Sequence, residues 1–123
     1  MTSILRALGL HEGDDRLLLI EPPDAVLAEA ASIAPRPAVA SSVHTARPAR
    51  RMVWWPEAHA LEPGALSRLR WLLAASDGIL WVIADPANGL DGATLAVRLQ
   101  EAGFAAERVT AGTTEAVRAR ASR

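Results

Sequence analysis

RRMVWWPEAHALEPGALSRLRWLLAASDGILWVIADP, residues 50–86, decides the fold class of this chain. It holds an apolar run at Met52–Trp55, a helical pattern over residues 63–75 that opens at Glu62-Pro63-Gly64, and a stronger apolar run at residues 78–84. Proline is tolerated in the first turn because the first N–H groups of a helix have no intrahelical partner. An apolar strand, a helix and a second apolar strand in this order are typical of a parallel crossover unit. The stretch predicts a parallel sheet with residues 78–84 as a central strand buried on both faces.

A second unit of strand, turn and helix precedes this stretch. Residues 17–20, LLLI, are a continuous apolar run of the length of a buried strand. Glu21-Pro22-Pro23 ends that strand because proline cannot donate a ladder hydrogen bond. Asp24 is placed to cap a helix over residues 25–34, and the spacing of apolar residues in 3–10 predicts a short leading helix.

The segment between these two units gives a weaker signal. Residues 39–43 predict a short strand, with a wholly irregular segment as the alternative. The link from Val43 to Arg51 is too short for a crossover helix. Such a strand must therefore either return across the sheet in extended form or pair antiparallel, and the sequence leaves both arrangements open.

After residue 86 the alternation of elements continues. Residues 93–102 have the apolar spacing of an amphipathic helix, and Gly103 is placed just beyond its last turn, where glycine is common. Residues 104–109 predict a last strand at the edge of the sheet.

The tail, residues 113–123, is polar and predicts a frayed end or a short helix with Ala116 and Val117 packed inward. The whole chain, residues 1–123, is then a single α/β domain. We predict a three-layer sandwich with a mostly parallel open sheet of four to five strands and right-handed crossovers.

Composition excludes several classes of function. The formal net charge is −1, from 13 basic and 14 acidic residues, which gives no electrostatic reason to expect a nucleic acid or an anionic membrane as partner. The chain has no cysteine, and all its basic residues other than histidine are arginine, so thiolate and Schiff-base chemistry are excluded. No stretch approaches the roughly 18 apolar residues of a membrane span. A cytoplasmic protein is expected.

Ligands of open parallel sheets bind at the carboxyl ends of the strands, and this rule gives a set of candidate residues. They are Glu21 and Asp24 after the first strand, His44 and Thr45 after the weak strand, Trp55, Glu57 and His59 after the third, and Asp85 and Asn88 after the fourth. We predict a ligand-binding rim formed by Glu21, Asp24, Trp55, Glu57 and Asp85. If Glu57 and His59 faced Asp85, acid–base chemistry or a metal site would follow. The sequence assigns no catalytic residue and no metal ligand.

The turn after the first strand argues against a phosphate site. A backbone cradle for a diphosphate needs glycines and free N–H groups at this place. Residues 21–25 are EPPDA, with no glycine and two prolines that lack an N–H group. A nucleoside diphosphate is not expected to bind there.

Trp71 differs from the other tryptophans in its expected environment. On the helix over residues 63–75 the leucines share one face, and Trp71 falls on the opposite side beside Arg68. Tryptophan and arginine are enriched at binding hot spots, so Trp71 and Arg68 are candidate interface residues. Packing of Trp71 against another part of its own chain is the alternative. Trp54 and Trp55 must point to opposite faces of the sheet, and Trp81 is expected in the core.

Four segments carry a resemblance to a known fold: LGLHEGDDRLLLIEPPDA (8–25), RRMVWWPEAHAL (50–61), LSRLRWLLAASDGILWVIADP (66–86) and RLQEAGFAAERVT (98–110). With these elements the chain resembles class I, S-adenosylmethionine-dependent methyltransferases. It looks more closely similar to short uncharacterised bacterial proteins that are reduced versions of that Rossmann-like fold. The chain departs from the methyltransferase pattern at Glu21–Asp24, where the family has a glycine-rich turn. Near His44 it lacks a counterpart of the acidic residue that holds the ribose.

The resemblance implies two kinds of function. The first is a non-catalytic or catalytically reduced methyltransferase-like domain that works through protein association, as a homodimer or an accessory subunit. The second is a domain that binds a small molecule such as S-adenosylmethionine, or a minimal methyltransferase. A metal-dependent hydrolase is a further alternative.

Overall fold

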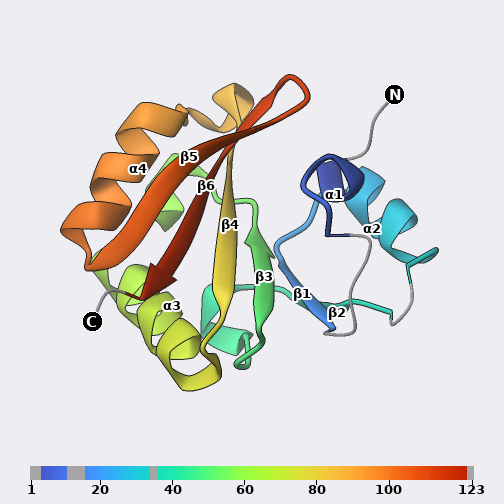
Figure 1. The fold of residues 1–123 in the computed structure, drawn as a ribbon, viewed down its shortest axis with the longest axis horizontal. Coiled ribbons are helices and arrows are strands. Elements are labelled where there is room, and N and C mark those ends of the chain that lie inside the picture. Colours follow the sequence, from blue (N-terminus) through green and yellow to red (C-terminus); the bar gives the residue numbers. More distant parts are fainter. Residues whose placement is uncertain (1–3, 11–15, 34–35, 122–123) are drawn as a thin grey trace.

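The computed structural model describes residues 4–10, 16–33 and 36–121 and contains one six-stranded sheet (Figure 1). The strands are β1 (Leu17–Ile20), β2 (Ala38–Ala40), β3 (Arg51–Trp54), β4 (Ile79–Ala84), β5 (Phe104–Ala111) and β6 (Thr114–Ala121). Their order is β2-β1-β3-β4-β6-β5, in which β2, β1, β3 and β4 are parallel and β6 is antiparallel to both its neighbours. The mostly parallel sheet is confirmed, with six strands instead of four or five.

Helices cover the sheet on both faces (Figure 1). Their bounds are α1 (Ile4–Ala7), α2 (Asp24–Ala30), α3 (Pro63–Ser76) and α4 (Gly92–Glu101). Buried residues of α3 and α4 form one hydrophobic cluster with one face of the sheet, and those of α1 and α2 form a second cluster with the other face. Because a strand alternates its side chains, β3 contributes Met52 and Trp54 to the first cluster and Val53 to the second. The three-layer arrangement is confirmed.

The predicted strand–helix–strand unit of residues 50–86 is present as β3, α3 and β4. Pro63 occupies the first turn of α3, and the helix ends at Asp77, whose φ is 53°. Gly78 follows because a Cβ atom there would lie 2.5 Å from the carbonyl oxygen of Ala49. The Ser76 hydroxyl donates to the same oxygen at 2.9 Å, which fixes the turn into β4.

Asp91 and Gly103 define the ends of α4. The Asp91 carboxylate accepts a hydrogen bond from the backbone N–H of Thr94 at 2.8 Å, a standard N-cap contact. Gly103 has a φ of +95°, as expected for the residue beyond the C-cap. The prediction for this helix and for the edge strand after it is confirmed.

The tail is a strand, so the predicted frayed end or helix is wrong for residues 114–121. A tight turn with Gly112 at a φ of +62° joins β5 to β6, and β6 inserts between β4 and β5. Ala116 and Val117 are both fully buried, but as strand neighbours they enter opposite clusters. The polar residue Arg118 is exposed and pairs with Glu107 of β5.

The weak strand is β2, and it pairs parallel with β1, so the antiparallel alternative is wrong. It is shorter than expected, and Val39 is 54% exposed instead of anchoring the segment. From β2 the chain passes through a single 3₁₀ turn, Val43–Thr45, and returns past β1 to β3. No helix in the described part of the chain is long and apolar enough to cross a membrane.

Candidate functional site

Two cavities lie at the carboxyl ends of the parallel strands. The larger, here called the Trp55 cavity, has a volume of about 450 Å³, and the smaller, the Glu21 cavity, about 260 Å³. Trp55 and Asp85 line the first, whereas Glu21 lines the second. The residues of the predicted rim are therefore divided between two sites.

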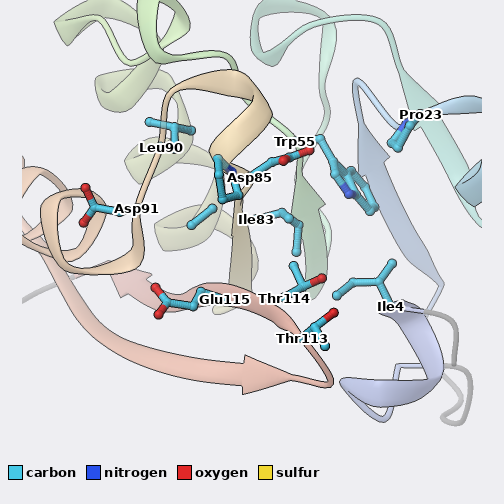
Figure 2. Close-up of a pocket in the computed structure, with 12 residues that line it drawn as sticks. Ile4, Pro23, Trp55, Ile83, Asp85, Leu90, Asp91, Thr113, Thr114 and Glu115 are labelled. Carbon is cyan, nitrogen blue, oxygen red and sulfur yellow. The ribbon is translucent and has the colours of Figure 1, made fainter.

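Residues from six parts of the chain form the Trp55 cavity (Figure 2). They are Ile4 of α1, Pro23 before α2, Trp55 after β3, Ile83–Pro86 at the end of β4, Leu90 and Asp91 before α4, and Thr113–Glu115 of the β5–β6 hairpin. In Figure 2 Trp55 and Ile4 lie on one side of the space, and Leu90 and Asp91 lie on the other. The cavity has an aromatic and aliphatic wall facing a polar one.

Three carboxylates line the Trp55 cavity, and backbone N–H groups position each of them. Asp85 accepts from the backbone N–H of Ala87 at 2.9 Å. Asp91 accepts from Thr94, and this backbone hydrogen bond lowers the pKa of the Asp91 carboxyl. Glu115 accepts from the backbone N–H of Gly92 at 2.9 Å.

No basic side chain is among the described residues that line this cavity. The nearest balancing charge is Arg108, whose guanidinium lies 3.0 Å from a carboxylate oxygen of Glu115. Three carboxylates thus face a space walled by Trp55, and Arg108 partly balances the charges of Glu115 and Asp91. Such a site favours a ligand that carries positive charge.

Glu21 lies on the other side of the rim in a strained backbone conformation. Its φ is 54°, which is uncommon for a residue other than glycine, and its backbone N–H donates to Ala40 at 3.0 Å. Burial raises the pKa of the Glu21 carboxyl, the Glu57 carboxylate raises it further, and His59 opposes both. The chain keeps a left-handed turn after β1 although this position holds no glycine.

Two pairs of histidine and glutamate flank Glu21. His59 Nδ1 lies 3.3 Å from Glu57 Oε2, and His44 Nε2 lies 3.6 Å from Glu62 Oε1, with all four side chains largely exposed. The Glu21 cavity is lined by Glu21, Ser42, Val43, His44, Trp54, His59, Ala60, Glu62 and Ala65. The pairs place two imidazoles and two carboxylates at its mouth.

The remaining candidates have other roles. Asp24 lies exposed within the first turn of α2 and makes no cap hydrogen bond, because the N-cap position is Pro23. The Asn88 amide donates to the carbonyl oxygen of Pro56 at 3.4 Å, and the Thr45 hydroxyl donates to that of Ser42. These contacts stabilise the loops at the carboxyl edge.

The metal-dependent alternative requires Glu57, His59 and Asp85 to converge. In the described ranges no group of three or more His, Asp or Glu side chains is arranged to hold a metal ion. His59 lines one cavity and Asp85 the other, so this constellation is not formed.

Trp71 is exposed, as the helical pattern predicted. Its side chain on α3 is 54% exposed, and the Arg68 guanidinium carbon lies 4.8 Å from the centre of its ring. Arg68 also donates to the carbonyl oxygen of Ala46 at 3.1 Å, and this hydrogen bond holds its guanidinium in place over the Trp71 ring.

Three of the twelve residues that line the Trp55 cavity come from the β5–β6 hairpin, which the sequence did not predict. Thr113, Thr114 and Glu115 were assigned to a polar tail. Residues 114–121, TEAVRARA, do contain a signal for a strand, since the exposed Arg118 and Arg120 alternate with apolar residues. Leu90 and Asp91 lie between β4 and α4, and only the fold shows that this segment borders the cavity.

The architecture is shared with solved structures of methyltransferases. One is the magnesium protoporphyrin IX methyltransferase ChlM from Synechocystis PCC 6803 with bound SAM, at a TM-score of 0.51 and 11% identity, with 95% of this chain and 74% of that chain covered. This chain has a methyltransferase-like fold. Human N-acetylserotonin methyltransferase in complex with SAM is also similar, at a TM-score of 0.49 and 12% identity, covering 98% of this chain and 51% of that one.

No protein-family model and no curated protein sequence matches this chain. At identities near 11% the likeness concerns the methyltransferase-like fold alone, because folds host many functions. The resemblance deduced from the sequence is therefore confirmed at the level of fold. Function has to be argued from the cavities.

Proposed function

We propose that this chain is a small-molecule-binding domain whose Trp55 cavity holds a cationic ligand, with S-adenosylmethionine as the candidate. The observation that carries the proposal is the lining of that cavity: Asp85, Asp91 and Glu115 face it together with Trp55, and no basic side chain does among the described residues. S-adenosylmethionine carries a sulfonium cation. The methyltransferase ChlM, whose fold is similar, was solved with bound SAM.

The size and composition of the Trp55 cavity suit such a ligand. Small-molecule sites have volumes of about 300–1,000 Å³ and mostly apolar walls with a few polar groups, and this cavity of about 450 Å³ falls in that range. An aromatic ring near a desolvated cation adds an attraction of about 1–2 kcal/mol. Trp55, only 8% exposed, provides a ring that is already held in place.

The turn between β1 and α2 limits the ligand further. Pro22 and Pro23 offer no N–H group, so a phosphate would find few donors in this turn. S-adenosylmethionine has no phosphate group. The proposal concerns binding and assigns no catalytic residue, in keeping with a reduced domain.

Titration calorimetry with S-adenosylmethionine and S-adenosylhomocysteine tests this function. Both ligands share the adenosine and amino-acid parts, but only the first carries the sulfonium charge. We expect S-adenosylmethionine to bind more tightly, and Asp85→Asn to reduce that preference. Glu101→Gln, on an exposed residue of α4 outside the cavity, is the matched control. No heat from either ligand at millimolar concentration, with an intact fold, would rule the function out.

Protein association is a second candidate function, favoured by the exposed pair of Trp71 and Arg68. The ring and the guanidinium are stacked before any partner arrives, so little side-chain entropy remains to be lost on binding. Aromatic and arginine side chains of this kind are enriched at interface hot spots. We propose a homodimer through this face of α3.

Sedimentation equilibrium tests the homodimer. We expect the unmodified chain to self-associate and Trp71→Ala to shift it to monomer. Val97→Ala serves as control, because Val97 is similarly exposed at 52% but lies on α4. A monomeric unmodified chain at the highest soluble concentration would overturn the homodimer.

A further inference from the structure

The Glu21 cavity is separate from the cavity proposed above for a cationic ligand. Trp54, the last residue of β3, lines the Glu21 cavity and belongs to the cluster under α3, whereas Trp55 belongs to the cluster on the opposite face. The two cavities share no lining residue in the part of the chain that the structure describes. Nothing described so far uses the smaller one.

Trp54, which lines the Glu21 cavity, has a buried hydrogen-bond donor without an acceptor among the described residues. Trp54 is 0% exposed, and its indole Nε1 is buried with no hydrogen-bond partner in the described part of the chain. Buried N–H groups without an acceptor are rare in native proteins. An acceptor atom supplied by a ligand in this cavity would satisfy the Trp54 N–H.

The first turn of α3 adds further donors beside Trp54. Ala65 in this turn lines the cavity and is 4% exposed, and the N-cap residue Glu62 makes no side-chain cap hydrogen bond. The first N–H groups of a helix lack intrahelical partners and carry its positive dipole end. Together with Trp54 they favour a carboxylate or carbonyl oxygen.

The other side of the Glu21 cavity carries hydrogen-bond acceptors with negative charge. Glu21 and Glu62 line it, with His44 paired to Glu62 and with His59 paired to Glu57 next to Glu21. A simple anion would satisfy the donors but would be repelled by three glutamates. A ligand with an ammonium group a few bonds from its carboxylate would satisfy both walls.

We propose that the Glu21 cavity binds a free α-amino acid as a zwitterion. The ligand carboxylate accepts hydrogen bonds from Trp54 Nε1 and from the first turn of α3. The ligand ammonium group donates to the Glu21 carboxylate. The volume of about 260 Å³ is sufficient for a free amino acid.

Two-dimensional ¹⁵N–¹H NMR of the tryptophan indole groups tests the proposal, with L-alanine as probe. The chain has four tryptophans, so four indole signals are expected. Trp55→Phe, Trp71→Phe and Trp81→Phe assign the Trp54 signal by elimination, without altering the fully buried Trp54. We expect L-alanine to move the Trp54 proton signal downfield in a saturable manner.

Two partial ligands and one variant sharpen the result. Acetate lacks the ammonium group and ethylammonium lacks the carboxylate, so we expect both to bind at least about tenfold more weakly than L-alanine. Glu21→Gln should weaken the binding of L-alanine by about tenfold, whereas Glu101→Gln should leave its affinity unchanged. An unmoved Trp54 signal at saturating L-alanine, or an equal response to acetate, would overturn the proposal. A response of Trp55 instead would assign the amino acid to the larger cavity and would equally overturn it.

Discussion

Trp54 and Trp55 are adjacent in the chain, but they pack into hydrophobic clusters on opposite faces of the sheet and line different cavities. The alternation of side chains along an extended backbone requires this arrangement. One dipeptide at the carboxyl end of β3 therefore provides an indole N–H group to one cavity and an aromatic wall to the other.

Substituting one of these tryptophans should affect one cavity only. We expect Trp55→Phe to weaken the binding of S-adenosylmethionine by no more than about tenfold. The aromatic wall is kept, but the indole, which is the stronger cation–π partner, is lost. The downfield shift of the Trp54 indole signal with L-alanine should not change. Calorimetry and NMR on the same variant check this, and parallel loss of both responses would show that the two cavities are coupled.

The turn from α3 into β4 should not tolerate a larger residue than glycine. A Cβ at Gly78 would lie 2.5 Å from the carbonyl oxygen of Ala49 and 2.8 Å from the Ser76 hydroxyl. We expect Gly78→Ala to lower the free energy of unfolding by about 1–3 kcal/mol, measured by urea denaturation.

Gly64→Ala is the matched control for this substitution. The nearest atom to a Cβ at Gly64 is a carboxylate oxygen of Glu62 at 3.7 Å, which is an ordinary contact. Alanine should stabilise the first turn of α3 by about 0.5–1 kcal/mol. If both variants lose the same stability, the close approach at Gly78 is not the cause.

The raised pKa of Glu21 gives a pH dependence of stability. Burial and the Glu57 carboxylate hold its folded-state pKa above the ordinary 4.5, so the folded protein binds this proton more tightly than the unfolded chain. The ionised Glu21 thus destabilises the fold at neutral pH, and this effect is lost as the pH falls through the folded-state pKa. We expect Glu21→Gln to raise stability at neutral pH and to have a smaller effect near pH 4.5.

Asp91 should show the opposite dependence. Its hydrogen bonds from Thr94 hold the pKa below the ordinary 3.8, so Asp91 stabilises the fold above that value and the effect is lost as the pH falls through the folded-state pKa. We expect Asp91→Ala to lower the melting temperature at neutral pH, and the difference from the unmodified chain to narrow below pH 3.8. Glu101→Gln should change the melting temperature little at either pH.

The sequence predicts the parallel half of this fold well because its strands are continuous apolar runs. LLLI is buried throughout, and ILWVIA is buried except at the partly exposed Ile79 and Trp81, so these runs favour strands of a sheet that is covered on both faces. The strand β6 was missed because it is built from alanine, arginine and threonine, whose local preferences are weak. Its place between β4 and β5 is set by long-range pairing.

The sequence named residues of the rim but not their arrangement. Of the five residues predicted for the rim, Glu21, Trp55 and Asp85 line a cavity, whereas Asp24 and Glu57 are not among the lining residues, and the binding of a ligand there stays a prediction. The division into two cavities depends on which face of the sheet each side chain enters. The acidic wall of the larger one depends on β6, since Glu115 pairs with Ala84 across the antiparallel ladder.

The position of β6 has a consequence for how the protein is made. β4, the central apolar strand, has a free edge until residues 114–121 have left the ribosome and inserted beside it. Pairing between parts of the chain this far apart is slow to form, and an open apolar edge invites contact with other chains. The apolar edge of β4 is thus covered by a segment that lies more than 30 residues further along the chain, and the sheet is complete only when that segment has paired.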